Sequence, residues 1–194
     1  MNNTIFDKIC EWCFDVMGWK IVGDIPYHFK QLLVIAAPHT SGWEILYGIG
    51  ARRKIALPVH FIAKKELFDN PFSGYLFSKL GGSPVDRSGN KNTVDEVLKH
   101  FDANERFYLS IAPEGTRAKV DKFKSGFYHI AKKGKLPLLM LGIDFARREF
   151  VFRPVYFIKG DKPDEEIAYI QQWFTQFKGY HPEKGVSPII ADRK

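Results

Sequence analysis

Two short apolar runs, each closed by a proline, most constrain the fold of this chain. The first run is Leu32–Ala37 before Pro38, and the second is Phe107–Ala112 before Pro113. Runs of this length without regular polar alternation are typical of strands that are buried on both faces, as in parallel sheets. Because helical patterns lie between these and other strand-like runs, the sequence predicts an α/β fold.

The remaining elements follow from hydrophobic spacing, helix capping and turn residues. Further strands are expected over 59–63, 136–144 and 150–158, and the last two are placed to pair. Helices are expected over 4–20, 43–51, 65–80 with a break at Pro71, 92–103, 124–133 and 163–177. No repeat or linker divides the sequence, so we expect an N-terminal amphipathic helix in residues 1–20 and one domain over 21–194.

The composition excludes several classes of protein. The 194 residues are 45% hydrophobic and include two cysteines, which is typical of one globular domain in a reducing compartment rather than a disulfide scaffold. The longest apolar runs are far shorter than the roughly 18 residues of a membrane span. Acidic residues interrupt the N-terminal apolar stretch, so no secretory signal is expected. The chain is therefore expected in the cytoplasm, peripheral to the cytosolic face of a membrane.

Positive charge is concentrated in the middle of the chain. The whole chain carries a net charge of +7, whereas residues 52–153 carry 20 basic and 11 acidic residues. A local positive field favours an anionic partner such as a phosphate, an anionic lipid surface or a nucleic acid, although a merely solubilising surface is equally compatible. The basic clusters include Arg52–Lys54, Lys64–Lys65, Lys119/Lys122/Lys124, Lys132–Lys135 and Arg147–Arg148.

A histidine and an acid follow the first apolar run. His39 stands directly after Pro38, and Glu44 comes five positions later. Within a helix, this offset would point the two side chains apart. They can meet only if His39 precedes a helix and Glu44 lies in its first turn. A carboxylate that holds an imidazole is the base half of a catalytic triad, but this spacing alone is also common in surface loops.

The second apolar run leads into Pro113-Glu114-Gly115-Thr116-Arg117. Glycine permits a tight turn, and the planar fork of an arginine suits a phosphate. Since ligands collect at the carboxyl ends of strands in open α/β sheets, both segments are candidates for one site.

Taken together, these segments resemble the lysophospholipid acyltransferases, which include the 1-acylglycerol-3-phosphate and glycerol-3-phosphate acyltransferases. Four motifs stand in family order between about Trp19 and Asp144. They are His39–Glu44, the region Phe61–Phe68 with Gly81–Arg87, Pro113–Arg117 followed by Phe123–Gly126, and Leu136–Leu139. One position departs from the family, which most often has Asp where this chain has Glu44. The longer side chain can orient His39 only if its backbone lies slightly further away.

The resemblance implies a fold, a reaction and a set of site residues. The fold is a single α/β domain of the glycerol-phosphate acyltransferase type, with a central mixed, mostly parallel sheet flanked by helices. His39 takes the proton from the acceptor hydroxyl, whose oxygen attacks the thioester carbonyl of the acyl donor, and Glu44 orients His39. The family pattern assigns the acceptor's phosphate to Arg87, Glu114, Gly115, Thr116 and Arg117, and an auxiliary oxyanion or phosphate contact to Lys64.

The resemblance also implies the partners. The donor is acyl-CoA or acyl carrier protein, used as a co-substrate, and no other cofactor is expected. The acceptor is a lysophospholipid, with 1-acylglycerol-3-phosphate giving phosphatidic acid as the leading case. The remaining histidines lack metal-ligand spacing, so no metal is expected. The aromatic and aliphatic residues of the first helix favour contact with a membrane surface, although the same helix also suits packing on the sheet. The residues expected at the membrane are Ile5, Ile9, Trp12, Phe14 and Trp19.

Three alternatives remain open from the sequence. The same chemistry suits glycerol-3-phosphate, another lysolipid or an aminolipid as acceptor. A catalytically silent lipid- or anion-binding protein is a second alternative, with Glu44 as its degenerate position. A hydrolase that uses His39 is the third, but the sequence lacks a metal cluster and a G-x-S-x-G nucleophile motif. No nucleic-acid-binding pattern is present.

Overall fold

A seven-stranded sheet forms the centre of the molecule. The computed structural model describes residues 5–85 and 93–188. The strand order is β1-β7-β6-β2-β5-β3-β4, and among these neighbours only β6 and β7 run antiparallel. The strands are β1 (Lys20–Val22), β2 (Gln31–Ala37), β3 (Val59–Lys64), β4 (Gly82–Val85), β5 (Phe107–Ile111), β6 (Leu138–Asp144) and β7 (Glu149–Phe152). The expected mixed, mostly parallel sheet is confirmed.

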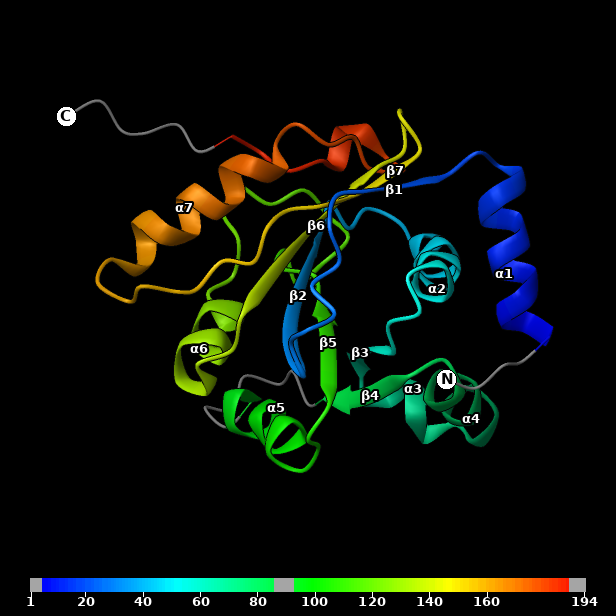
Figure 1. Cartoon of the computed structure of the whole chain (residues 1–194), viewed down its shortest axis with the longest axis horizontal. Coiled ribbons are helices and arrows are strands. Elements are labelled where there is room, and N and C mark those ends of the chain that lie inside the picture. The colour runs from blue at the N-terminus through cyan, green and yellow to red at the C-terminus, as the bar shows by residue number, and fades with distance from the viewer. Residues whose placement is uncertain (1–4, 86–92, 189–194) are drawn as a thin grey trace.

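Helices cover both faces of this sheet (Figure 1). On one face lie α5 (Thr93–Asp102), α6 (Gly126–Gly134) and α7 (Pro163–Phe174). On the other face lies α2 (Glu44–Lys54), which α1 (Ile5–Val16) covers from outside, with α3 (Glu66–Asp69) and α4 (Pro71–Lys79) at the β4 edge. Two apolar cores fill the spaces between the layers: Phe127 and Phe174 are fully buried in the first, and Phe14 and Leu32 in the second.

The parallel pairing of β2 and β5 brings the two candidate segments to one edge of the sheet. Ile35 of β2 lies opposite Ile111 of β5, so the chain leaves both strands at the same level. Pro38 and Pro113 follow within a few residues. The two motifs, which are more than 70 residues apart in sequence, therefore meet beyond the carboxyl ends of neighbouring strands.

Most of the predicted elements are present, and two short strands were missed. The helix expected over 65–80 is divided at Pro71 into α3 and α4, as the proline predicts. The strand expected over 150–158 ends at Phe152 in the structure. The missed strands are β1, which has three residues, and β4, whose Gly82 and Pro84 are unusual in a strand. Both strands lie at edges of the sheet, where the glycine and proline of β4 are tolerated.

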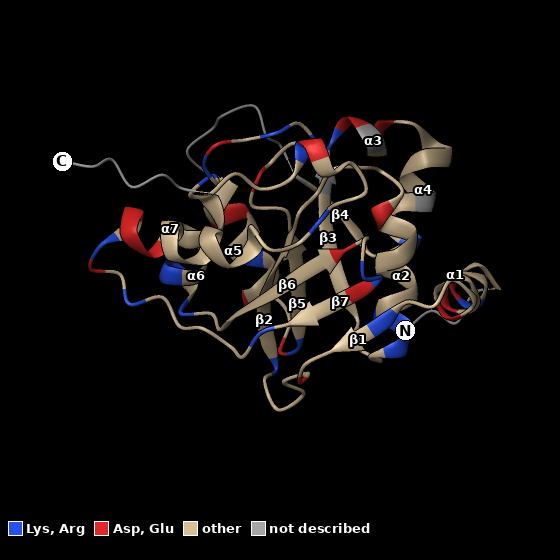
Figure 2. Ribbon diagram, turned by 90° about the horizontal axis from the view of Figure 1, so that it is seen from above, with Lys and Arg blue, Asp and Glu red and all other residues tan. Residues whose placement is uncertain are grey.

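The first helix packs with Asp7, Cys10 and Phe14 buried, and three of its acids pair with α2. Asp7, Glu11 and Asp15 recur at helical spacing on α1 and pair with three consecutive cations of α2. Figure 2 shows that α1, with its acidic residues in red, lies beside α2. The pairs are Asp7 with Arg52 at 3.5 Å, Glu11 with Arg53 at 2.7 Å and Asp15 with Lys54 at 2.7 Å. From the sequence, the Arg52–Lys54 cluster was a candidate to bind an external anionic partner. In the structure, its three cations form ion pairs with acids of α1 instead.

The outward side of α1 is consequently apolar. Its large exposed side chains are Ile5, Phe6, Ile9, Trp12 and Val16, of which Ile5 is 78% exposed. The expectation of membrane contact is wrong for Phe14 and Trp19, because both are buried in the second apolar core. No helix in the described part of the chain is long and apolar enough to cross a membrane.

Candidate active site

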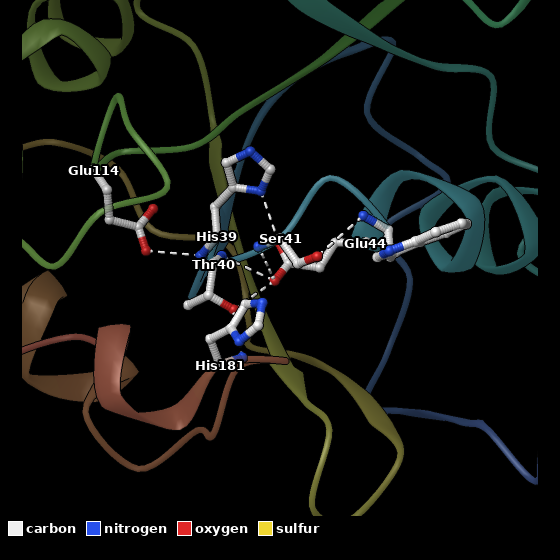
Figure 3. A network of polar contacts seen from close by, with 7 residues as sticks. His39, Thr40, Ser41, Glu44, Glu114 and His181 are labelled. Carbon is white, nitrogen blue, oxygen red and sulfur yellow. Dashed lines mark hydrogen bonds and ion pairs between the residues drawn. The ribbon is translucent and has the colours of Figure 1, made fainter.

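The His39–Glu44 contact expected from the sequence is present. The chain turns after β2 through residues 38–43, and α2 begins at Glu44. The side chain of Glu44 turns back from the first position of the helix toward the preceding loop (Figure 3). Its Oε2 lies 2.7 Å from Nδ1 of His39. A carboxylate is stable at this position because the helix N-terminus carries a partial positive charge.

The second oxygen of Glu44 organises the loop that carries His39. Oε1 accepts hydrogen bonds from the amide of Thr40 at 2.9 Å, the hydroxyl of Thr40 at 2.8 Å and the amide of Ser41 at 3.0 Å. The C-terminal segment joins this network, since the amide of His181 donates to the Thr40 hydroxyl at 3.0 Å (Figure 3). Gly179 is required nearby, because a Cβ there would lie 2.6 Å from the Thr40 hydroxyl oxygen. Sequence reasoning missed Thr40, Ser41 and this segment.

These bonds determine which nitrogen of His39 is available for chemistry. An ionised carboxylate only accepts hydrogen bonds, so Nδ1 carries the proton that it donates to Glu44. Nε2 then keeps its lone pair. The His39 side chain is 37% exposed, whereas that of Glu44 is 3% exposed. The arrangement is a solvent-accessible base supported by a buried carboxylate.

Glu114 lies behind the His39 loop rather than on the surface. It is 3% exposed, and its Oε1 accepts a hydrogen bond from the backbone amide of His39 at 2.9 Å. Its Oε2 is buried without a hydrogen-bond partner among the residues that the structure describes. Burial raises the pKa of Glu114 to about 7, a shift that the bond from the His39 amide only partly offsets.

The other residues of the second motif form a cationic rim. Gly115 has a φ of +66°, and Thr116 and Arg117 that follow it are exposed. A Cβ at Gly42 would lie 3.0 Å from Nη1 of Arg117, which places this guanidinium against the His39–Glu44 loop.

Lys124, which sequence reasoning did not assign to the site, belongs to the same rim. Its amide donates to the carbonyl of Pro113 at 2.9 Å, and its side chain lies over Gly115. Its signals in the sequence are its place in the basic cluster Lys119/Lys122/Lys124 and its position within the family-like stretch Phe123–Gly126.

A cavity of about 980 Å³ opens at this cationic rim. His39, Glu44, Thr116, Arg117 and Lys124 are among its lining residues. Most of its other lining residues are aliphatic or aromatic and come from α2, from the sheet and from the α4 region. The cavity therefore joins a charged entrance to an apolar interior.

Two expected site residues cannot be placed. Arg87 and the side chain of Lys64 lie outside the described residues, so their assignments stay predictions. Within the described ranges, no group of three or more His, Cys, Asp or Glu side chains is arranged to hold a metal ion.

The comparisons with known proteins identify the family. The model of the family described as Acyltransferase matches residues 22–144, which include both motifs and the strands that carry them. The chain belongs to the acyltransferase family.

Several named acyltransferases are similar to this chain. It is 36% identical over 110 residues to the 1-acyl-sn-glycerol-3-phosphate acyltransferase of Bacillus subtilis, covering 55% of this chain and 52% of that protein. It is 35% identical over 149 residues to the enzyme of the same name from Cocos nucifera, covering 67% and 48%. The chain thus spans about half the length of these relatives.

A solved structure supports the fold assignment. The 1-acyl-sn-glycerophosphate acyltransferase of Thermotoga maritima superposes with a TM-score of 0.63, covering 87% of this chain and 75% of that one at 21% identity. The single α/β acyltransferase fold expected from the sequence is confirmed.

The buried Glu114 predicts a specific pH dependence of stability. Its pKa of about 7 lies above the ordinary value of 4.5, so the folded state holds this proton more tightly than the unfolded state. The free energy of unfolding should therefore fall as pH rises from about 4.5 to about 7, by about 3 kcal/mol for this group. Glu114→Gln should remove this component, as measured by urea unfolding at pH 5 and pH 8.

The matched control is Glu96→Gln on the exposed surface of α5. It should keep the pH dependence of the wild-type protein. The same slope in Glu114→Gln and wild type would show that Glu114 does not titrate in this range.

Proposed function

We propose that this chain transfers a fatty acyl group from an acyl thioester to the hydroxyl of a lysophospholipid, with 1-acylglycerol-3-phosphate as the leading acceptor and phosphatidic acid as the product. The observation that carries the proposal is the 2.7 Å contact between His39 Nδ1 and Glu44 beside an apolar cavity. This contact leaves Nε2 as a base where a hydroxyl can reach it. The names and identities of the relatives support the same reaction.

The reaction requires two proton transfers through His39. Nε2 accepts the proton of the acceptor hydroxyl while the oxygen attacks the thioester carbonyl, and Glu44 stabilises the imidazolium that forms. The tetrahedral intermediate then collapses with cleavage of the carbon–sulfur bond. The thiol leaves with the proton returned from Nε2, and an ester is formed. No acyl-enzyme is needed, so Ser41, which is buried, is not a nucleophile in this scheme.

The cationic rim suits the phosphate of the acceptor. Arg117 and Lys124 approach the His39 loop from the second motif, and both are exposed. An arginine binds phosphate with two parallel hydrogen bonds, whereas a lysine acts as a compact charge. A phosphate held there would place the glycerol hydroxyl close to His39. Lys64 and Arg87 are further candidates for this rim on the family pattern.

The apolar interior suits the acyl chain of the donor, which is acyl-CoA or acyl carrier protein. Aliphatic and aromatic walls remove hydrocarbon from water, and such burial is favourable in proportion to the area covered. The thioester carbonyl would then lie at the entrance, beside His39. No further cofactor is required by this scheme.

Glu114 acts as a positioning residue for His39. The sequence assigned it to the substrate, but a side chain that is 3% exposed and bonded to the His39 amide suits a supporting role. Its bond fixes the backbone of His39 from the side opposite the bonds of Glu44 (Figure 3).

Contact with the cytosolic face of a membrane explains the outward apolar side of α1. The acids of this helix are engaged with α2, so its free side presents Ile5, Ile9 and Trp12. Phe72 of α4 is 81% exposed and adds to the apolar surface of this half of the molecule. Such a helix lies in the interface of a bilayer rather than across it.

Replacement of the proposed base tests the reaction. His39→Ala should lower the acceptor-dependent release of thiol by about 10²- to 10⁴-fold, the contribution typical of general base catalysis. The assay uses acyl-CoA and acyl carrier protein donors of several chain lengths, with lysophosphatidic acid, glycerol-3-phosphate and other lysolipids as acceptors.

His129→Ala, at an exposed position of α6, is the control and should keep wild-type activity. Full activity in His39→Ala would overturn the mechanism. Thiol release without an acceptor would indicate a thioesterase. If no combination of donor and acceptor releases thiol, the result would favour a catalytically silent binding protein.

The phosphate site predicts a selective effect on the acceptor. Arg117→Ala should raise the acceptor KM by about 10- to 100-fold, because a charge-assisted hydrogen bond is lost, with a smaller effect on the donor KM. Lys99→Ala, an exposed cation of α5, should change neither constant. Steady-state kinetics in which each substrate is varied separately measure both KM values. An unchanged acceptor KM would place the phosphate site elsewhere.

The membrane contact predicts a loss of vesicle binding. The double variant Ile5→Ser/Trp12→Ser should bind phosphatidylcholine–phosphatidate vesicles at least about tenfold more weakly, because each side chain contributes apolar burial of roughly 1.5–3 kcal/mol. Cosedimentation measures this binding, and urea unfolding should show little change, since both side chains are exposed. Phe157→Ser, at another exposed aromatic position, is the control. Equal binding by all three proteins would exclude α1 as the membrane contact.

A further inference from the structure

The segment that follows α7 packs on β6 and continues to the turn after β2. The ring of Phe177 lies against the backbone of β6, since a Cβ at Gly142 would meet it at 2.3 Å. The carbonyl of Lys178 then accepts a hydrogen bond from the amide of Phe145 at 2.8 Å. Because β6 neighbours β2 in the sheet, these contacts bring the segment to Thr40 along a defined path.

The contact with Thr40 directs a hydrogen bond onto the Glu44 carboxylate. The amide of His181 only donates, and an ionised carboxylate only accepts. The Thr40 hydroxyl therefore accepts from the amide at 3.0 Å and gives its own hydrogen to Oε1 of Glu44 at 2.8 Å (Figure 3). Hydrogen bonds in such a chain polarise one another, so the first strengthens the second. The Thr40 hydroxyl thus supports the carboxylate that orients the base.

Gln171 of α7 makes a second connection, to the loop that follows the Pro113–Arg117 motif. It is 0% exposed. Its Oε1 accepts a hydrogen bond from the amide of Phe123 at 2.8 Å, and its Nε2 donates to the carbonyls of Asp121 at 2.8 Å and Ser187 at 2.9 Å. One buried side chain therefore joins α7 to this loop and to the C-terminal segment. Buried backbone groups left without a partner are unfavourable, so the course of the loop depends on Gln171.

The loop that Gln171 holds carries a cation of the rim. Lys124 follows directly after Phe123, and its amide donates to the carbonyl of Pro113 at 2.9 Å. Its side chain lies over Gly115. The place of this ammonium at the entrance of the cavity therefore depends on a loop that α7 fixes from behind.

We propose that α7 and the segment after it hold both loops of the active site in their reactive arrangement, with Thr40 as the positioning residue of the base and Gln171 as that of the phosphate site. The proposal rests on the proposed acyl transfer. Thr40 is 2% exposed, and neither residue lines the cavity, so each acts through the groups that it binds. Gln171 and His181 lie beyond residues 22–144, the region that the family model matches.

The first test concerns the base. Thr40→Val removes the hydroxyl at nearly constant shape and should lower kcat by about tenfold, close to the contribution of one hydrogen bond to a charged group, with both KM values within about twofold. Thr40→Ser keeps the hydroxyl and should restore most of the activity. Gly179→Ala should lower kcat as well, because its Cβ would lie 2.6 Å from the Thr40 hydroxyl oxygen and force the segment away. Thr175→Val is the control, since that hydroxyl bonds to the carbonyl of Gln172 at the end of α7.

The second test concerns the phosphate site. Gln171→Met has a similar length but no amide, and it should raise the acceptor KM by about threefold to tenfold with a smaller change in kcat, because Lys124 loses its support. Gln172→Met, on the exposed side of α7, is the matched control and should change neither constant. A general loss of stability would lower kcat in both sets of variants, so it cannot produce a kcat effect at Thr40 together with a KM effect at Gln171.

The kinetic outcomes are decisive for each residue. Unchanged kcat in both Thr40→Val and Gly179→Ala, or an equal loss in Thr175→Val, would overturn the role of Thr40. An unchanged acceptor KM in Gln171→Met would overturn the role of Gln171. If Gln171→Met does not fold, Thr40→Val and Gly179→Ala, which leave α7 intact, still test whether the C-terminal segment positions the base.

Amide hydrogen exchange separates this proposal from the proposed function, because it requires no activity. The Ser41 amide should exchange at least about tenfold faster in Thr40→Val and Gly179→Ala, and the Phe123 amide in Gln171→Met, as the bonds that protect them weaken. Unchanged exchange at both amides would overturn the proposal. Faster exchange in a protein that transfers no acyl group would support the positioning of the loops, although acyl transfer had failed.

Discussion

The rest of the site depends on the hydrogen bonds of the Glu44 carboxylate. This carboxylate stands at the first position of α2, receives three hydrogen bonds from Thr40 and Ser41 through one oxygen, and holds the His39 imidazole through the other. These bonds fix both the course of the loop and the proton on Nδ1. The same carboxylate also lies at the positive end of the helix, which stabilises its ionised form. One buried group therefore holds the loop conformation, the start of the helix and the orientation of the His39 imidazole.

The departure from the family pattern at this position has a structural explanation. A glutamate at the first position of α2 must reach back to the backbone of residues three and four positions earlier, and its extra methylene provides that reach. The 2.7 Å contact with His39 is made together with the bonds to the loop, so the longer side chain serves both purposes at once. The expectation that its backbone stands further from the histidine than that of an aspartate stays a prediction.

The sequence predicted the fold and the two halves of the site because both depend on local patterns. Apolar runs closed by prolines located β2 and β5, and their shared edge followed from parallel pairing. The burial of Glu114 could not be predicted, since it depends on how the second motif packs against the first. Nor could the contact of residues 179–181 with Thr40, which is made by a segment without a regular pattern more than 100 residues away. The strands β1 and β4 were missed because pairing with neighbours, not their own composition, makes them strands.

Helix α1 contacts a residue of the cavity wall through Asp7 and Arg52 and presents apolar side chains at the surface. An amphipathic pattern reports that a helix has two sides, but which side faces inward depends on the partner. Here three consecutive cations of α2 pair with the acids of α1, and Cys10 and Phe14 are buried on the same side of the helix. The side that carries Ile5, Ile9 and Trp12 faces outward. Arg52 belongs to that row of pairs and also lines the cavity. One guanidinium therefore contacts α1 and also forms part of the cavity wall.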